Sequence, residues 1–331
     1  MENILKSSTF PIEIDRANVL NDEDARIFVS QDNDVALSDV NRVLRTINAL
    51  PRRSNPGAVS APVMTGCFSI FDLNKPMYHC VFLHKLESNT VTTSDTDNVV
   101  VFSEHDYAPE RTKSLQLATP RYYRSQEALK PGIGDPKDGT LTKDGSYWLS
   151  STIGGSVHAR LTFSSNSEPW VYCASHYRSD EELRNLIREF GSKYEYSVAT
   201  KIIDPDAFAL WLGVDFTLGF DKTADVSLSL QEELVYRTSR CAVSSWTESR
   251  PIDTVVHVYY GPVIYADISG RVDKQDHLFD PLAGPQTWFT KKTALSSQRE
   301  YRFAVSTLGT PVRQKHYISV SPELRATTLT V

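Results

Sequence analysis

The chain has 331 residues, of which 40% are hydrophobic and 23% are charged. These proportions exclude a disordered chain, because disordered segments carry too little apolar surface to form a core. The formal net charge of −6 argues against a protein that tracks nucleic-acid phosphates. We therefore expect no nucleic-acid partner, although a local basic patch stays open.

Cysteine usage and apolar runs bear on location. The four cysteines are scattered, form no Cys-x-x-Cys pair and have no histidine at zinc-ligand spacing: Cys67, Cys80, Cys173 and Cys241. We expect reduced thiols and no metal site. The N-terminal residues MENILKSSTFPIEIDR lack the apolar segment of a signal peptide, and no apolar run approaches the ~18 residues of a membrane span. These features predict a cytoplasmic protein without a membrane partner.

Residues 1–114 are predicted to form a β-rich N-terminal region with one helix. The helix begins at Ser38, whose hydroxyl can accept an orphan amide hydrogen bond, and ends at Pro51, which cannot continue the hydrogen-bond ladder. The turn residues Asn74-Lys75-Pro76 predict a hairpin. Alternating or continuous apolar patterns predict four strands, at Phe10–Ile14, Val63–Phe71, Tyr78–Lys85 and Asn98–Ser103.

Residues 115–331 are predicted to form an α+β C-terminal domain, and the boundary falls within a loop-rich stretch over 104–146. In the segment PGIGDPKDGTLTKDG (131–145), glycines could let backbone amides approach a phosphate. The segment lacks the Gly-Lys-Ser/Thr ending of a phosphate loop, and Asp135, Asp138 and Asp144 would repel an anion. A surface loop is therefore the prediction.

Two capped helices alternate with strands over 147–213. Ser179 and Glu182 form an S-x-x-E capping box that begins the first helix, and Gly191 is placed to end it. Asp204 caps the second helix, with proline at its first position, and Gly213 is placed to end it. Strands are predicted at Val157–Phe163, Pro169–Ser175 and Tyr194–Ile203.

The last third of the chain is predicted to be mostly strand. Ser227–Tyr236 fits either a helix or a strand, and Gly261-Pro262 divides the run Thr254–Asp267 into a hairpin or a bent strand. Trp288–Ser306 predicts a short strand, a Ser/Gln turn and a second strand, as a pair that closes the sheet. The last extended pieces are His316–Val320 and Thr327–Val331. The fold class is therefore α+β, with a mixed or antiparallel sheet and a few short helices.

Glu300 is the strongest lead to chemistry. Gln298, Glu300 and Arg302 recur at every second position, so their side chains are expected on one face of a strand. The element Ser-Ser-Gln298-x-Glu300 resembles the turn-and-strand element of arginine-type ADP-ribosyltransferases. The resemblance implies NAD as the cofactor and Glu300 and Gln298 as catalytic residues. The glutamate would bond a ribose hydroxyl and stabilise an oxocarbenium-like transition state.

An NAD site of this kind would also need residues from other strands. The same resemblance requires an early strand with Arg or His, which Arg160 or His158 could supply, and a later Ser-Thr-Ser strand. Ser150-Ser151-Thr152 precedes Arg160, contrary to the family's order. His176 and Arg178 follow the Trp170 strand and either bind an anion or nucleotide or form only a helix-entry loop. The cofactor-binding candidates are Arg160, His158, His176, Arg178 and Arg302.

A second resemblance is broader. It is carried by the segments WVYCAS (170–175), VATKIIDPDAFA (198–209), HVYYG (257–261) and FTKKTALSSQREYRF (289–303). Over residues 170–303 the chain is similar to uncharacterised bacterial proteins, some of which accompany phage-defence or toxin genes. This resemblance implies a bacterial cytosolic protein of that type and assigns no activity.

Two functions stay open. One is a nucleotide- or NAD-handling enzyme of the defence or toxin type that uses Glu300. The other is a non-catalytic binding or sensor module for a protein partner. In that module the 288–306 strands are structural, Glu300 and Arg302 pair with charges on a neighbouring strand, and Lys291, Lys292 and Arg299 are solvated. The surroundings of Glu300 discriminate between the two.

Overall fold

A computed structural model of the chain describes most of its predicted elements. The described residues are 12–17, 63–72, 77–86, 98–125, 140–151, 155–166, 168–194, 196–228, 252–265, 288–291, 293–307 and 309–331. The predicted helix from Ser38 to Pro51, the Asn74-Lys75-Pro76 turn and most of Ser227–Tyr236 lie outside these residues.

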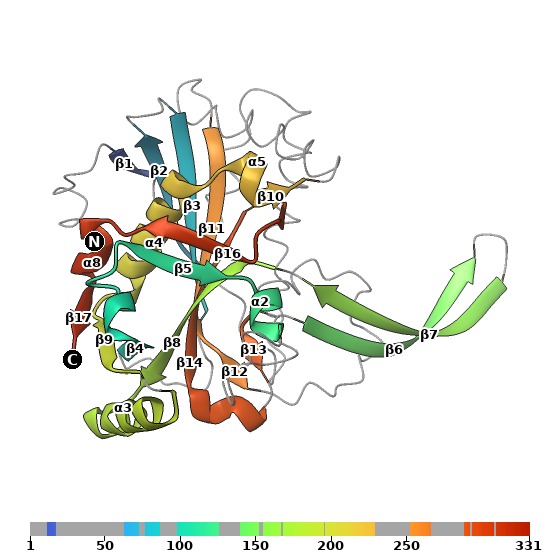
Figure 1. Cartoon of the computed structure of the whole chain (residues 1–331). Coiled ribbons are helices and arrows are strands. Elements are labelled where there is room, and N and C mark those ends of the chain that lie inside the picture. Colours follow the sequence, from blue (N-terminus) through green and yellow to red (C-terminus); the bar gives the residue numbers. More distant parts are fainter. Residues whose placement is uncertain are drawn as a thin grey trace.

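An 11-stranded mixed sheet organises the molecule (Figure 1). All described neighbours in it are antiparallel except β3 and β11, which run parallel. The strands along the path are β1 (Ile12–Ala17), β2 (Val63–Asp72), β3 (Met77–Lys85), β11 (Ile252–Pro262), β14 (Glu300–Ser306), β8 (Trp170–Tyr177), β4 (Asn98–Ser103), β9 (Val198–Ile202) and β17 (Thr328–Thr330). Strands β5 (Ser114–Ala118) and β16 (Lys315–Ser319) branch from it at β8. The predicted α+β class with a mixed sheet is confirmed.

The smaller elements lie around this sheet. Among the described residues, three two-stranded sheets pair β6 (Thr140–Ser151) with β7 (Gly155–Asn166), β10 (Val226–Ser227) with β15 (Thr310–Pro311), and β12 (Ile264–Tyr265) with β13 (Thr290–Lys291). In Figure 1 the β6–β7 hairpin extends away from the rest of the ribbon. The described helices are α2 (Pro120–Arg124), α3 (Asp180–Tyr194), α4 (Pro205–Gly219), α5 (Lys222–Asp225) and α8 (Pro322–Ala326), with 3-10 turns η2 (His105–Tyr107) and η4 (Thr293–Gln298).

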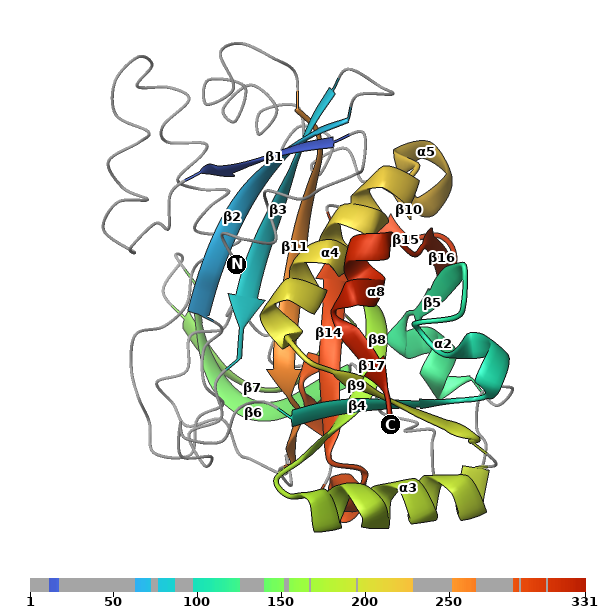
Figure 2. The ribbon, with the colours of Figure 1, turned by 90° about the vertical axis from the view of Figure 1, so that its left-hand side faces the viewer.

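Helix α4 covers one face of the sheet and forms the centre of the core (Figure 2). Its start was predicted correctly, since the Asp204 side chain accepts a hydrogen bond from the Ala207 amide at 2.9 Å. Its end was not, because Gly213 lies inside the helix rather than after it. A Cβ there would lie 2.7 Å from Val81 and 2.8 Å from Val258. Gly213 therefore permits close approach of helix and sheet.

Helix α3 crosses one end of the sheet instead (Figure 2). The predicted cap is present, since the Ser179 hydroxyl accepts from the Glu182 amide at 3.2 Å. The Glu182 carboxylate does not return this bond to Ser179 and instead accepts from the Arg178 amide at 2.7 Å. Gly191 does not end the helix, which continues to Tyr194.

Among the other predicted elements, most strands are confirmed, and two predictions differ from the structure. The β2–β3 hairpin and the strands predicted near β1, β4, β7, β8, β9, β16 and β17 are confirmed. The stretch 104–146 was predicted to be loop-rich, but its described residues hold β5, α2 and the start of β6, so the surface loop predicted over 131–145 is strand from Thr140 onward. The rest of that predicted loop, 131–139, lies outside the described residues. The predicted 288–306 strand pair is also wrong: β13 pairs with β12, and β14 lies between β11 and β8. Strands from both sides of the predicted boundary at residue 115 pair within one sheet.

One further finding concerns membranes. Within the described ranges, no helix combines the length and the apolar character needed to cross a bilayer.

Candidate functional site

A cavity of about 130 Å³ opens on the face of the sheet that carries Glu300. Its floor comes from β8, β13, β14 and the end of η4, and its walls come largely from aromatic side chains of β4, α2 and α3. The lining residues are Phe102, Tyr123, Cys173, Ala174, Ser175, Phe190, Tyr194, Tyr196, Lys291, Gln298 and Glu300. Segments that are far apart in the sequence therefore meet at one site.

Strand register determines which side chains meet at the floor. Glu300 lies opposite Ser175, and Arg302 lies opposite Cys173. Residues directly opposite each other in an antiparallel pair point to the same face, so these four side chains share one side of the sheet. The alternate residues of β14, such as Phe303, belong to the core beneath α4. The predicted common face of Glu300 and Arg302 is confirmed.

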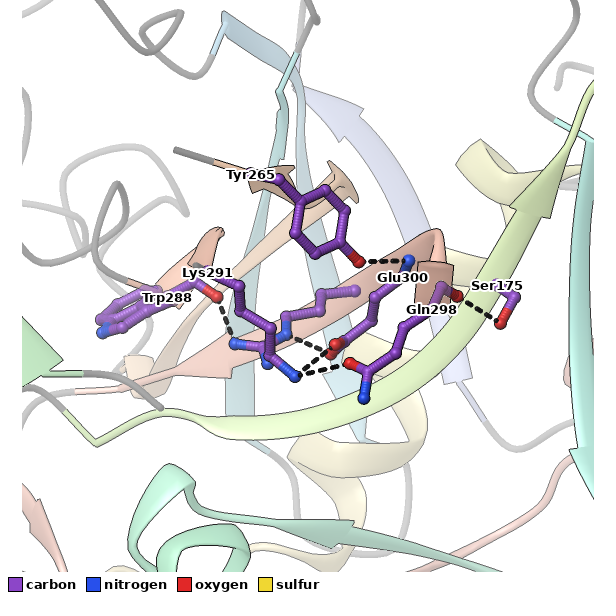
Figure 3. Close-up of polar contacts among 7 residues, drawn as sticks. Ser175, Tyr265, Trp288, Lys291, Gln298 and Glu300 are labelled. Atoms are coloured by element: carbon purple, nitrogen blue, oxygen red, sulfur yellow. Dashed lines mark hydrogen bonds and ion pairs between the residues drawn. The ribbon is translucent and has the colours of Figure 1, made fainter. Parts of the chain in front are cut away.

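The Glu300 carboxylate is buried and carries two ion pairs (Figure 3). Its Oε1 atom accepts from Arg302 Nε at 2.5 Å, and its Oε2 atom lies 2.5 Å from Lys291 Nζ. Arg302 is fully buried and also donates to the Trp288 carbonyl at 2.5 Å. Burial alone would raise the pKa of Glu300, but Arg302 and Lys291 more than offset it and lower the pKa to about 2. The carboxylate is ionised at neutral pH.

The backbone just before Glu300 makes a left-handed turn. Arg299 has a φ of 44°, which non-glycine residues adopt at a cost of about 1–3 kcal/mol. Two bonds from the end of β8 hold this turn: the Ser175 hydroxyl donates to the Gln298 carbonyl at 3.2 Å, and the His176 amide donates to the Arg299 carbonyl at 2.7 Å. The Glu300 amide donates to the Tyr265 hydroxyl at 2.9 Å. The turn is thus fixed on both sides.

Gln298 lies beside the ion pairs rather than on the strand. It is the last residue of η4, and its Oε1 atom accepts from Lys291 Nζ at 3.4 Å (Figure 3). The expected strand alternation therefore does not extend back to Gln298. The left-handed turn at Arg299 nevertheless brings Gln298 and Glu300 to the same cavity.

The walls form an aromatic cluster. The rings of Phe102 and Phe190 stack with centroids 4.4 Å apart, and Phe190 also contacts Tyr194 at 5.2 Å and Tyr196 at 6.3 Å. On the α2 side, burial and the neighbouring Cys173 raise the pKa of the Tyr123 hydroxyl well above its usual range, so it stays protonated. An aromatic wall above a charged floor suits a planar ligand that carries polar groups.

The predicted site residues are distributed unevenly. Glu300, Gln298 and Arg302 come together. His158 and Arg160 belong to β7, whose partner is β6 in a separate sheet. His176 and Arg178 lie at the end of β8, where their backbone amides bond Arg299 and Glu182 respectively. The assignment of these four residues to cofactor binding stays a prediction.

Lys291 is a residue of the candidate site that the sequence did not point to. It was expected to be solvated in the structural alternative, yet its side chain is only 4% exposed and pairs with Glu300. The aromatic residues Trp288 and Phe289, which are buried just before it, were the available signal. The wall residues carried no comparable signal, because Tyr123 of α2 lies in the stretch that was predicted to be loop-rich.

Comparisons with protein-family models, with curated proteins and with solved structures found no match to this chain. The function is therefore argued from the geometry of the cavity.

Proposed function

We propose that the protein binds a nucleotide-like ligand in the Glu300 cavity and cleaves NAD there, in the manner of an ADP-ribosyltransferase. The observation that carries this proposal is an ionised, buried carboxylate at the floor of an aromatic-walled cavity. A cavity of about 130 Å³ approaches the ~150 Å³ apolar cavity that holds benzene, so it accommodates one aromatic ring. The ribose and phosphates of a dinucleotide would lie outside it.

The chemistry needs a negative charge near the ribose. When the bond between ribose C1′ and the nicotinamide nitrogen breaks, nicotinamide leaves with the bonding pair and the ribose gains oxocarbenium character. The Glu300 carboxylate would stabilise that charge and accept a bond from a ribose hydroxyl. Lys291 and Arg302 occupy two of its about four acceptor positions, which leaves room for such a bond. Water or an acceptor side chain then attacks C1′ and loses a proton.

Nicotinamide release from NAD tests the proposal. We expect release by the wild-type protein and a loss of about 10²–10³-fold in Glu300→Gln, which keeps the shape but removes the charge. Glu181→Gln is the matched control, because Glu181 is an exposed carboxylate on α3 outside the cavity. Circular dichroism must show both variants folded. No release by the wild type, or equal release by folded Glu300→Gln, would contradict the proposal.

One observation favours a second candidate, a binding or sensor module for a protein partner. Both oxygens of Glu300 are already engaged in ion pairs, and β14 is a central strand of the sheet. Under this alternative, Glu300 is structural and NAD neither binds nor reacts. Glu300→Gln would then lower the unfolding temperature, while calorimetry with NAD would show no heat of binding for either protein. The bacterial defence or toxin role and the cytoplasmic location stay predictions.

A further inference from the structure

Arg299 connects the cavity floor to helix α3. Its left-handed backbone separates Gln298 from Glu300, and its side chain points away to α3, where Nη1 lies 2.5 Å from Glu182 Oε2. The ion pair is half-exposed, with 38% of the Arg299 side chain and 26% of the Glu182 side chain accessible. One residue therefore combines an unusual backbone conformation with a contact between two elements.

Glu182 is itself held firmly. It lies in the first turn of α3, and the carboxylate oxygen that meets Arg299 also accepts from the Arg178 amide at 2.7 Å. Burial would raise the pKa of Glu182, but these partners lower it, so the carboxylate is charged at neutral pH. The opposite end of the helix supplies Phe190 and Tyr194 to the cavity wall.

We propose that the Glu182–Arg299 ion pair is a latch that holds α3 against the cavity, which makes Arg299 a positioning residue. The first helical turn is fixed to the turn that presents Gln298 and Glu300, so wall and floor keep one relative position. Leu183 and Leu186 anchor the helix to the sheet, and the latch adds the polar contact at its start. The inference rests on the cavity of the proposed function but not on NAD chemistry.

Two roles of Arg299 can be separated by substitution. Glycine adopts a positive φ without steric cost, so Arg299→Gly keeps the turn and removes only the ion pair. Glu182→Gln removes the same ion pair from the other side. Arg299→Lys keeps the positive charge at the turn. The latch predicts that the first two variants behave alike and that the third resembles the wild type.

The Cys173 thiol reports on the cavity without any ligand. It lines the cavity and is half-buried, whereas Cys80 is buried in the core and reports on global unfolding. We would measure N-ethylmaleimide labelling of each cysteine by peptide mass spectrometry. A half-exposed ion pair stabilises the closed position of α3 only modestly. Its loss in Glu182→Gln or Arg299→Gly should therefore raise the labelling rate of Cys173 about two- to five-fold and leave the rate of Cys80 unchanged. Arg299→Lys and the control Glu181→Gln should label near the wild-type rate.

Wild-type Cys173 labelling in both Glu182→Gln and Arg299→Gly would overturn the latch. Equal acceleration in Glu181→Gln would also overturn it, because it would show a general effect of charge at the helix start. If Cys173 labelling follows the prediction while no variant releases nicotinamide, the latch stands and the proposed NAD chemistry fails. If the wild type releases nicotinamide but Cys173 labelling is unchanged in Glu182→Gln and Arg299→Gly, the NAD chemistry stands and the latch fails.

Discussion

Helices α3 and α4 have the same length, 15 residues, and each begins at a side-chain oxygen cap, yet they serve the molecule differently. Every residue of α4 from Ala207 to Thr217 is buried. Among the α3 residues whose burial is described, only Leu183, Leu186 and Tyr194 are buried, and most of the others face solvent. The comparison teaches that α4 builds the core on one face of the sheet, whereas α3 covers the cavity on the other face with few buried side chains. We therefore expect α3 to open locally at a lower free energy than α4.

The largest expected effect is at the centre of α4. Trp211→Ala should lower the free energy of unfolding by about 3–5 kcal/mol, because it deletes a fully buried ring. Ile187→Ala in α3 is the control, since Ile187 is 36% exposed and should change stability by less than about 1 kcal/mol. Urea unfolding of both variants checks this. Similar losses would show that α3 is as integral to the core as α4.

A pH effect of up to a few kcal/mol is expected from Asp215 in α4. Burial raises its pKa to about 7, although the Ser321 amide donates to it at 2.9 Å; Glu323 adds to the rise and Arg325 opposes it. The folded protein therefore holds a proton that the unfolded chain releases near pH 4. Stability contributed by Asp215 is present below about pH 4 and is lost as pH rises to about 7. Asp215→Asn should flatten the pH dependence of urea unfolding over that window, and an unchanged slope would refute the assignment.

Alanine substitutions at Gly213 in α4 and Gly191 in α3 should change stability by smaller amounts and in opposite directions. Gly213→Ala in α4 should destabilise by about 1–3 kcal/mol, because its Cβ would meet Val81 and Val258 at under 3.0 Å. Gly191→Ala in α3 should stabilise by about 0.5–1 kcal/mol, because it lies inside the helix and its Cβ would find only an ordinary contact at 3.5 Å. Thermal unfolding measures both. A destabilising Gly191→Ala would mean that α3 packs more tightly than its exposure indicates.

The smallest effects are at the caps. Asp204→Ala and Ser179→Ala should each cost about 1 kcal/mol of helix stability. In α4 that loss should lower global stability, since the helix cannot open without exposing the core. In α3 it should accelerate amide hydrogen exchange in the first turn and leave most of the core protected. Hydrogen exchange measured by mass spectrometry distinguishes the local effect in α3 from the global effect in α4. A uniform loss of protection in Ser179→Ala would show that α3 opens only when the core does.

The sequence predicts these helices well at their starts and poorly at their ends. Caps are local, so Ser179 and Asp204 were identified from neighbouring residues alone. Gly191 and Gly213 were taken as stops, but Gly213 is required by the approach of α4 to two strands that no local pattern reveals. Strand β5 was missed although its burial alternates at Leu115 and Leu117, because the surrounding turn residues obscured a short period-two signal.

The cavity was only partly predictable. The common face of Glu300 and Arg302 followed from strand geometry, whereas Gln298 reaches the cavity through the left-handed turn at Arg299, which strand alternation does not predict. Lys291 was not expected, because its direction depends on the pairing of β13 with β12, which no local periodicity encodes. The aromatic walls depend on strand order, which places β4 beside β8 and brings Phe102 to Phe190. Such an order depends on the whole chain.

The parallel pairing of β3 with β11 has a consequence for synthesis. His84 and His257, hydrogen-bonded at 3.0 Å across these strands, lie 173 positions apart in the sequence. At the usual ribosomal rates, the β2–β3 hairpin waits about 10–35 s for the strand that covers its edge. An apolar strand edge exposed for that time invites pairing with another chain. The yield of folded protein should therefore depend on translation speed and on chaperones that shield this edge.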